Sequence, residues 1–255
     1  MYDLDRILRE TFLARAEYLE CVDSTNRRAT EVALEGGPLP FLIAAQRQTA
    51  GRGRGAHRWW TGPGALVFSL AVAAETIGVE RSRAPLASLA VGVAVADAVA
   101  PWLPSGAVAL RWPNDVLAAG RKLSGILIEV LSNRRHVIGI GVNTNNTMAD
   151  APMELQSVAT TLRDRTGRRY DPTETLLVVL NRLDRVFADL RNHPETVAAR
   201  ADVLCWQRGR RLAYRQGDRL IEGRCAGIAS DGALLLETSS GVTPIYTGTP
   251  VDFES

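Results

Sequence analysis

Hydrophobic positions follow two different periods along most of the chain. Apolar side chains at helical spacing predict amphipathic helices over residues 3–16, 152–165, 172–190 and 195–206, and another that opens within Asp23–Asn26 and ends at Gly36. Short runs rich in β-branched residues predict strands over residues 18–22, 41–45, 66–73, 108–112, 123–131 and 137–142, with Gly125 breaking the fifth. Residues 84–100 carry small apolar side chains and predict a buried helix closed by Pro101.

The pattern changes near Cys205. Short strand-like runs over residues 211–215, 219–228, 233–237 and 242–246 are separated by turn sequences that contain Gly, Asp and Ser. Turns at this spacing predict a small β-barrel or sandwich of about 50 residues. We therefore expect two domains, over residues 1–204 and 205–255.

Composition excludes several classes of protein. A net charge of +2 over 255 residues does not suit a general polyanion binder, so anion contacts must come from a local cluster. The three cysteines are far apart, which argues against a disulfide framework and a zinc site and favours the reducing cytoplasm. The first residues lack the apolar core of a signal peptide, and the most apolar run, 86–100, contains Asp97 and is too short to span a bilayer.

The basic residues contain one exception. Of 30 Lys and Arg side chains, Lys122 is the only lysine. A compact ammonium and a guanidinium are not interchangeable at a confined anion, so Lys122 is a candidate site residue. A second cluster alternates Gly and Arg over Gly51–Gly55, which has no apolar face and predicts a loop whose N–H groups and guanidiniums bind an anion. The alternative for this loop is a basic segment that touches nucleic acid.

Other polar positions follow the predicted strands. Asp115 comes seven residues before Lys122, and Asn143 follows a strand with Gly139 and Gly141 on one face. No histidine cluster, Gly-x-Ser-x-Gly motif or Cys–His pairing is present, which argues against hydrolysis by a nucleophilic side chain. A site rich in cations and poor in nucleophiles suits a reaction between two anions, such as a carboxylate and a nucleoside triphosphate with its divalent cation.

Five motifs in order resemble the biotin protein ligase family, that is, the biotin–[acetyl-CoA-carboxylase] ligases. They are Asp23-Ser-Thr-Asn26, Gln48-x-x-Gly-Arg-Gly-Arg54, Trp112-Pro-Asn-Asp115, Lys122-Leu-Ser-Gly125 and Gly139-Ile-Gly-Val-Asn143. The resemblance implies an α+β fold, with helices packed on a mixed sheet like that of class II synthetases, and an SH3-like barrel at the C-terminus. It also implies that biotin and ATP with Mg²⁺ give biotinyl-5′-AMP, from which the biotinyl group passes to a lysine of a biotin carboxyl carrier protein.

The resemblance also implies roles for individual residues. Those expected to bind biotin are Ser24, Thr25, Asn26, Gln48, Gly51, Arg52, Gly53, Arg54, Lys122, Gly125, Gly139 and Gly141. Those expected to bind ATP or the adenylate are Arg52, Arg54, Trp59, Asn114, Lys122 and Asn143. Lys122, Arg52 and Asp115 are the catalytic candidates, and Mg²⁺ arrives with ATP, with no fixed protein ligand. Residues alone favour a core position for Trp59, whereas the resemblance favours a cover over the adenine.

Two departures from the family pattern affect the expectations. Arg111 stands where the family commonly has Lys, so it is not counted as catalytic. Only 23 residues precede Ser24, too few for a winged helix-turn-helix, so we expect a cytoplasmic ligase that binds neither DNA nor membrane, as a monomer or homodimer. A lipoate or octanoate ligase, and a phosphate- or nucleic-acid-binding module using residues 47–58, are the alternatives.

Overall fold

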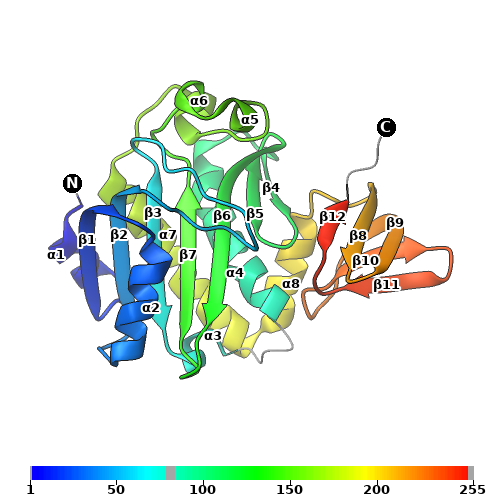
Figure 1. Cartoon of the computed structure of the whole chain (residues 1–255), viewed down its shortest axis with the longest axis horizontal. Helices are drawn as coiled ribbons and strands as arrows, with labels where there is room; N and C mark the ends of the chain where they lie inside the picture. Colours follow the sequence, from blue (N-terminus) through cyan, green and yellow to red (C-terminus); the bar gives the residue numbers. More distant parts are fainter. Residues whose placement is uncertain (1, 79–83, 252–255) are drawn as a thin grey trace.

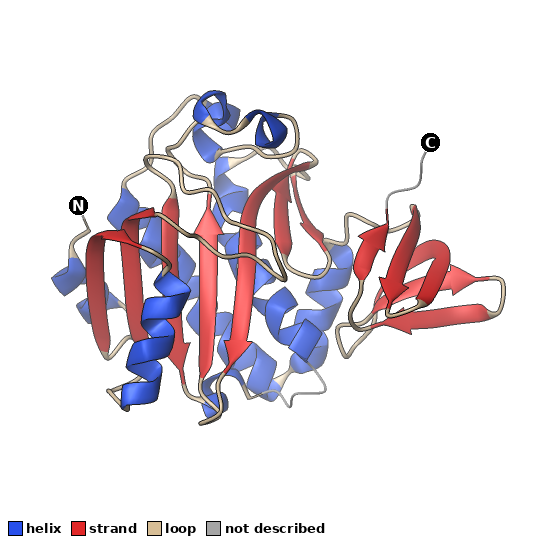
Figure 2. Cartoon of the chain, viewed as in Figure 1, coloured by secondary structure: helices blue, strands red, loops and turns tan. Residues whose placement is uncertain are grey.

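Two β-sheets of unequal size organise the chain (Figures 1 and 2). The computed structural model describes residues 2–78 and 84–251, so the last four residues of the expected C-terminal domain lie outside the described residues. The larger sheet has the order β1-β2-β3-β7-β6-β5-β4, and the smaller has the order β11-β10-β9-β8-β12. In the larger sheet β1 and β2 are parallel and all other neighbours are antiparallel, so the sheet is mixed, as expected.

The elements have the following bounds. The α-helices are α1 (Leu4–Glu10), α2 (Thr25–Glu35), α3 (Ala74–Ile77), α4 (Ala84–Val99), α5 (Met153–Gln156), α6 (Leu162–Thr166), α7 (Pro172–Asn192) and α8 (Pro194–Val203). The strands of the larger sheet are β1 (Arg15–Val22), β2 (Phe41–Gln48), β3 (Leu66–Val72), β4 (Val108–Arg111), β5 (Asp115–Ala118), β6 (Arg121–Val130) and β7 (His136–Val142). Those of the smaller sheet are β8 (Arg211–Gln216), β9 (Arg219–Ile228), β10 (Leu234–Thr238), β11 (Gly241–Ile245) and β12 (Thr249–Val251).

The two faces of the larger sheet join different hydrophobic cores. Side chains alternate between faces along a strand, so Leu42 and Ala44 of β2 join the main core, which includes residues of α4 and α7. Phe41 and Ile43 face the other way and form a small second core with α2. Because α2 covers only part of that face, the rest is free to carry polar groups, and we call it the site face.

Helix α4 is apolar on nearly all sides because most of it is buried, with Asp97 as a partly exposed exception. Among the described residues, the stretch Pro85–Trp102 is long and apolar enough to cross a bilayer by composition, but 67% of it is buried inside the protein. It packs against β4, β5, β6, α7 and α8. These contacts are those of a core helix in a globular protein.

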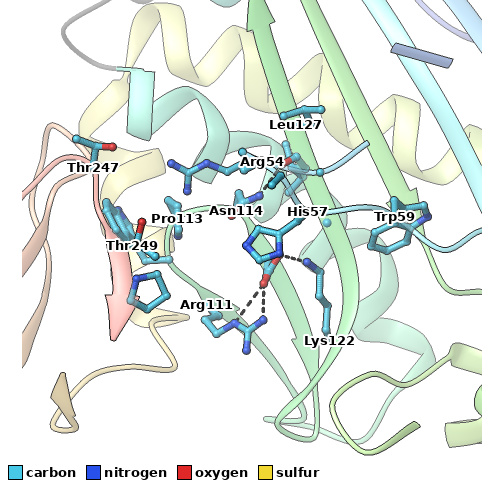
Figure 3. Close-up of a pocket in the computed structure, with 18 of the residues that line it drawn as sticks. Arg54, His57, Trp59, Arg111, Pro113, Asn114, Lys122, Leu127, Thr247 and Thr249 are labelled. Carbon is cyan, nitrogen blue, oxygen red and sulfur yellow. Dashed lines mark hydrogen bonds and ion pairs between the residues drawn. The ribbon is translucent and has the colours of Figure 1, made fainter. Parts of the chain in front are cut away.

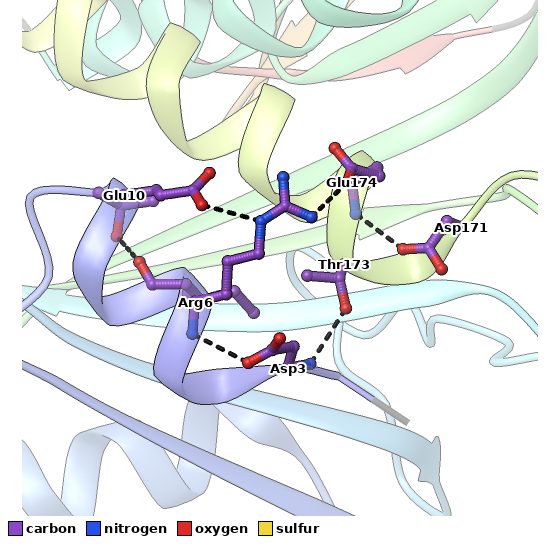
Figure 4. A network of polar contacts seen from close by, with 8 residues as sticks. Asp3, Arg6, Glu10, Asp171, Thr173 and Glu174 are labelled. Atoms are coloured by element: carbon purple, nitrogen blue, oxygen red, sulfur yellow. Dashed lines mark hydrogen bonds and ion pairs between the residues drawn. The ribbon is translucent and has the colours of Figure 1, made fainter.

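The N-terminal helix is tied to α7 by polar contacts (Figure 4). The N–H of Asp3 donates to Thr173 Oγ1 at 3.0 Å, and the Asp3 carboxylate caps α1 by accepting from the N–H of Arg6. The Arg6 guanidinium forms ion pairs with Glu10 at 2.9 Å and with Glu174. These contacts fix α1 against the start of α7, far from the site face.

Several sequence predictions are wrong in detail. The helix predicted over 3–16 ends at Glu10, because Thr11 is extended and the chain turns into β1. The helix predicted over 152–165 is two short helices, because residues between them pair with β6: the N–H of Lys122 donates to Val158 O, and the N–H of Thr160 donates to Lys122 O. Strands β5 and β12 were not predicted.

The smaller sheet is antiparallel throughout, and the residues that lead into it, Leu204–Trp206, pair with Leu110 of β4. The side chain of Gln207 brackets Trp112: its Oε1 accepts from the Trp112 N–H at 2.7 Å, and its Nε2 donates to the Trp112 carbonyl at 3.1 Å. The indole N–H of Trp112 donates to Gly232 O at 3.0 Å. The residue that leads into Pro113-Asn114-Asp115 is therefore held by the C-terminal part of the chain.

Candidate functional site

A single row of paired residues crosses the site face. Val67 of β3 pairs with Gly141 of β7, which pairs with Gly125 of β6. Gly125 pairs with Asp115 of β5, which pairs with Arg111 of β4. Directly paired residues point to the same face, so the row runs from an apolar residue, across two glycines, to an acid and a base. At about 4.8 Å per strand, the row from Gly141 to Arg111 spans about 14 Å.

Lys122 reaches this face because β6 contains a β-bulge. Strict alternation from Gly125 would place Lys122, three residues earlier, on the opposite face. The pairing register shifts between Val116, which pairs with Ser124, and Leu117, which pairs with Lys122. Leu123 is the extra residue, and it lies fully buried in the main core. The bulge turns Lys122 onto the site face, a use of bulges that is common beside functional sites. The prediction of a break at Gly125 is therefore wrong; the irregularity is at Leu123.

Asp115 is held between two cations (Figure 3). Lys122 Nζ lies 2.6 Å from Asp115 Oδ1, and Arg111 Nη2 lies 2.6 Å from Oδ2. The Asp115 side chain is 10% exposed, against 31% for Lys122 and 41% for Arg111, so the carboxylate is the buried centre of the group. Arg111 thus contacts the site directly, although it was not counted as catalytic because it departs from the family's usual Lys.

The start of α2 is held by a polar network at the other end of the row. Gln48 Oε1 accepts from the N–H of Thr25 at 2.8 Å and from its hydroxyl at 3.1 Å. Ser69 Oγ donates to Asn26 Oδ1 at 2.6 Å and lies 2.8 Å from Thr25 Oγ1. Ser24 is also buried, but its side chain does not cap the helix. The network fixes three polar side chains of the Asp23–Asn26 motif and β2 at the edge of the cleft.

Gly139 leaves space for Asn26. A Cβ at Gly139 would lie 2.0 Å from Asn26 Oδ1, so any larger residue there would displace this amide. Asn26 Nδ2 then donates to Glu129 Oε2 at 2.9 Å, and Arg52 Nη2 lies 3.0 Å from Glu129 Oε1. Glu129 therefore connects the α2 network to the arginine loop. Alternation from Gly125 predicts Glu129 on the site face, so the pattern of the strand already marks this residue.

The Gly–Arg loop folds into a small hairpin. Arg52 pairs with Arg58, the N–H of Gly53 donates to His57 O at 2.9 Å, and the N–H of Trp59 donates to Gly51 O at 3.0 Å. Of the N–H groups predicted to bind an anion, that of Gly53 is used within the loop, while anion binding by the others stays a prediction. Arg52 and Arg54 are both exposed, and the Arg52 guanidinium is paired with Glu129.

Trp59 lies over the two glycines at the centre of the row. A Cβ at Gly141 would lie 2.4 Å from the indole, and one at Gly125 would lie 3.0 Å from it. Lys122 Nζ is 5.7 Å from the centroid of the indole ring, within range of a cation–π contact. The Trp59 Nε1 atom is buried without a hydrogen-bond partner among the described residues. The ring is partly exposed, so it is neither a core residue nor a free lid.

A cleft of about 1130 Å³ joins these groups. The sequence-predicted residues that line it are Ser24, Thr25, Asn26, Gln48, Arg52, Gly53, Arg54, Trp59, Asn114, Asp115, Lys122, Gly125, Gly139 and Gly141. Gly51 and Asn143 do not line it: Gly51 packs against Trp59 O, and the Asn143 side chain accepts from Asn146 Nδ2 at 3.1 Å. Strand β8 and residues 247–251 form the opposite wall, which was not predicted because no motif marks these residues.

The charge of the cleft favours anions. Its lining includes the cations Arg52, Arg54, Arg58, Arg111, Lys122, Arg211 and Arg215. Among the described lining residues Asp115 is the only acid, and two of these cations already contact it. No group of three or more His, Cys, Asp or Glu side chains that could hold a metal occurs in the part of the chain that the structure describes. The arrangement suits two anionic substrates held side by side.

Comparisons with known proteins point to the same chemistry. Residues 18–145 match the Biotin/lipoate A/B protein ligase family, and residues 209–252 match the Biotin protein ligase C terminal domain. The bifunctional ligase/repressor BirA of Bacillus spizizenii is 30% identical over 241 residues, covering 90% of this chain and 71% of that protein. The biotin–[acetyl-CoA-carboxylase] ligase of Mycobacterium tuberculosis is 32% identical over 229 residues, covering 88% and 84%.

A solved structure is similar to this chain over nearly its whole length. Biotin protein ligase from Aquifex aeolicus in complex with biotin and ATP has a TM-score of 0.81 and 28% sequence identity, covering 93% of this chain and 98% of that chain. The similarity thus extends over both sheets and the cleft between them. The chain belongs to the biotin protein ligase family.

Proposed function

We propose that the cleft performs both steps of biotin attachment on the residues of the central row. The chain is an ATP-dependent ligase that activates biotin and transfers it to a carrier protein. In the first step a biotin carboxylate oxygen attacks the α-phosphorus of ATP and pyrophosphate leaves. In the second step a lysine amine of a biotin carboxyl carrier domain attacks the acyl carbon and AMP leaves. The observation that carries the proposal is the position of Lys122 and Asp115, between the α2 network and the cationic wall.

The biotin ring belongs at the α2 end of the row. Thr25, Asn26 and Gln48 offer hydroxyl and amide groups to a polar ring, and Ser24 lies beside them. Gly125, Gly139 and Gly141 provide a surface without side chains for the ring. Gly51 and Gly53 allow the backbone of the Gly–Arg loop to come close to the ligand. Because the Trp59 indole occupies the surface over Gly125 and Gly141, biotin can lie there only after the indole has moved.

The carboxylate and α-phosphate meet at Lys122. Two anions repel each other, and the ammonium of Lys122 together with the guanidiniums of Arg52 and Arg54 offsets this repulsion as the new bond forms. Arg52 exchanges its contact with Glu129 for the ligand. A point charge suits the position between carboxylate and phosphate better than a planar guanidinium, which would demand a different geometry.

The adenine end and the acceptor use the remaining residues. Once the Trp59 indole has moved off Gly125 and Gly141, it provides an aromatic surface for the adenine base. Asn114 and Asn143 are the polar partners of the base. Asn143 can take this part only if its contact with Asn146 is exchanged. Asp115 orients the acceptor lysine, because a carboxylate attracts the incoming ammonium and holds the amine near the acyl carbon.

Mg²⁺ fits this cleft as part of the nucleotide. It is commonly bound by substrate phosphates with only one or two protein carboxylates. Asp115 is the one carboxylate on the described lining, and it is held by Arg111 and Lys122. We therefore propose that the metal enters with ATP and shields the triphosphate charge, while the protein supplies the cations around it.

The remaining assignments concern the whole molecule. We propose that residues 1–204 form the biotin- and ATP-binding domain and 205–255 the SH3-like domain, consistent with the two sheets. The partner is the carrier domain of a biotin-dependent carboxylase, and the net charge of +2 does not favour DNA. Three free cysteines agree with the cytoplasm. The oligomeric state is a monomer or a homodimer.

An exchange assay with isotopic pyrophosphate and ATP tests the proposed function. The purified chain is incubated with ATP, Mg²⁺ and labelled pyrophosphate, with biotin in one sample and lipoate in another. We expect biotin-dependent labelling of ATP and none with lipoate. Exchange with lipoate alone would make the chain a lipoate ligase. Salt-dependent DNA binding without exchange would favour the nucleic-acid alternative.

A further inference from the structure

The Arg52 guanidinium lies at the opposite end of β6 from Lys122. It pairs with Glu129, with 3.0 Å between Nη2 and Oε1 and 3.2 Å between Nη1 and Oε2. Glu129 comes four residues after Gly125 on β6, about 13 Å along the strand, whereas Lys122 precedes Gly125. Figure 3 shows Lys122 well apart from Leu127, which comes between Gly125 and Glu129 on the strand. To act together with Lys122, the Arg52 guanidinium therefore has to leave Glu129.

The acid is the fixed partner of this ion pair. Glu129 Oε2 accepts from Asn26 Nδ2 at 2.9 Å, and Asn26 Oδ1 accepts from Ser69 Oγ at 2.6 Å. These hydrogen bonds hold the amide, and through it the carboxylate, in one orientation. The Glu129 side chain is 27% exposed, against 50% for Arg52. Because Arg52 lies in an exposed loop that alternates with glycine, the arginine is the partner that can move.

The position of Glu129 indicates which ligand takes Arg52 from it. Asn26 joins Glu129 to the α2 end of the cleft, where the proposed function places the biotin ring. The only charged group of biotin is its carboxylate, which lies toward Lys122 when the ring is at that end. The carboxylate of biotin and that of Glu129 present the same charge and the same two oxygens to a guanidinium. The two acids therefore compete for Arg52.

We propose that Glu129 is a positioning residue, which holds Arg52 away from Lys122 until the carboxylate of biotin replaces it. The proposal rests on the proposed function, since it takes the ring at the α2 end and the carboxylate at Lys122 from there. While Arg52 is held, the guanidinium and the ammonium are too far apart to repel each other strongly. Biotin brings the negative charge that allows both cations to come together, and it loses part of its affinity in breaking the pair between Arg52 and Glu129.

The test compares biotin with biotinol, which has the same ring and chain but ends in a neutral alcohol. Titration calorimetry without ATP gives the Kd of each compound for wild type, Glu129→Gln, Arg52→Gln and the double variant. Glu129→Gln keeps a carbonyl oxygen for Asn26 and removes the charge that holds Arg52. Glu17→Gln is the matched control, because Glu17 forms a partly exposed ion pair with Arg28 at 3.2 Å and does not line the cleft.

We expect Glu129→Gln to bind biotin about threefold more tightly than wild type, the change that loss of a competing, partly exposed ion pair gives. A gain in affinity cannot come from a variant that fails to fold. Biotinol should bind to Glu129→Gln as to wild type, because an alcohol does not attract Arg52. Glu17→Gln should bind both compounds as wild type does. In the Arg52→Gln background, Glu129→Gln should leave the Kd of biotin unchanged, since the guanidinium is gone.

Three results would overturn the proposal. The first is unchanged or weaker binding of biotin by Glu129→Gln. The second is equal tightening of biotin and biotinol, because Glu129 would then act on the place of the ring and not on the charge. The third is the same tightening of biotin in the Arg52→Gln background, because the effect of Glu129 would then not pass through Arg52.

Limited digestion with trypsin in the absence of ligands keeps this result separate from the proposed function. Trypsin cleaves after an arginine whose side chain can enter its own binding pocket, so cleavage after Arg52 reports how firmly Glu129 holds it. We expect this cleavage, followed by mass spectrometry, to be about threefold faster in Glu129→Gln than in wild type and in Glu17→Gln. Faster cleavage supports the hold on Arg52 even in a chain that binds no biotin. Equal cleavage in Glu129→Gln and wild type removes it, whatever the exchange assay shows.

Discussion

Lys122 and Asp115 form an ion pair, with 2.6 Å between Nζ and Oδ1, although neither position on its strand requires it. Asp115 begins β5, and Lys122 lies three residues before the glycine that pairs with Asp115. The extra residue Leu123 brings the ammonium onto the face of the carboxylate. The reactive part of the cleft is therefore built by a bulge in β6, and its consequences can be measured.

The contact between Gly141 and Trp59 predicts a specific energetic coupling. Gly141→Ala places a Cβ 2.4 Å from the indole, so the ring must leave its position. We expect the substitution to lower the free energy of unfolding by about 1–3 kcal/mol, the usual cost of overpacking. Urea denaturation measures this. In a Trp59→Ala background the same substitution should cost much less, since the ring is gone; an equal cost in both backgrounds would show that they are not coupled.

Gln207 is expected to stabilise the motif that carries Asp115. Gln207→Leu leaves the N–H and carbonyl of Trp112 without their partners in a buried place, which predicts a loss of about 2–4 kcal/mol in the free energy of unfolding. We also expect slower adenylation at temperatures where the variant stays folded, because Trp112 leads into Asp115.

Gln156→Leu is the matched control for Gln207. Gln156 is exposed and donates one hydrogen bond, to Ala151 O at 2.9 Å, far from the smaller sheet. Its loss should change the free energy of unfolding by less than about 0.5 kcal/mol. If the free energy of unfolding falls by the same amount in both variants, the hydrogen bonds between Gln207 and Trp112 have no special part in stability.

His136 predicts how stability depends on pH. Burial lowers the pKa of His136, with Glu75 opposing the shift, and its Nδ1 has no hydrogen-bond partner among the described residues. The unfolded state then binds the proton more tightly than the folded state. The contribution of His136 to the free energy of unfolding is therefore complete above the unfolded pKa of about 6.5 and is lost as pH falls through the folded pKa.

Replacing the two histidines separately tests this. His136→Gln should show a smaller fall in the free energy of unfolding between about pH 7.5 and pH 5 than wild type. His193→Gln, at an exposed position, should keep the wild-type fall. The prediction fails if His136→Gln retains the full fall.

Much of the site was visible in the sequence because its motifs depend on local rules. Asp23–Asn26 opens a helix, Gly36 ends it with φ at +92°, and the Gly139 and Gly141 pair lies on one face, as alternation requires. Such signals need only neighbours along the chain. The α+β fold and the mixed sheet followed from the family resemblance and are confirmed.

The parts that were missed depend on contacts between distant residues. The sequence around Lys122 and Leu123 fits a regular strand and a bulged strand equally well. Only the pairing of Lys122 with Leu117 shows that the strand is bulged. The segment near Val158 has a helical pattern, but it is extended because its backbone hydrogen-bonds to the backbone of Lys122. The wall formed by Arg211 and Arg215 depends on how the C-terminal sheet docks, which Gln207 and Trp112 determine.

The central claim is that a point charge at Lys122, placed by the bulge, drives activation of biotin. Its most direct test is the rate of biotin-dependent exchange of labelled pyrophosphate into ATP by Lys122→Arg, with the exposed neighbour Arg121→Gln as control. We predict that Lys122→Arg loses most of the exchange rate, about a hundredfold, although charge is retained, while Arg121→Gln exchanges normally. Near-normal exchange by Lys122→Arg would contradict the account.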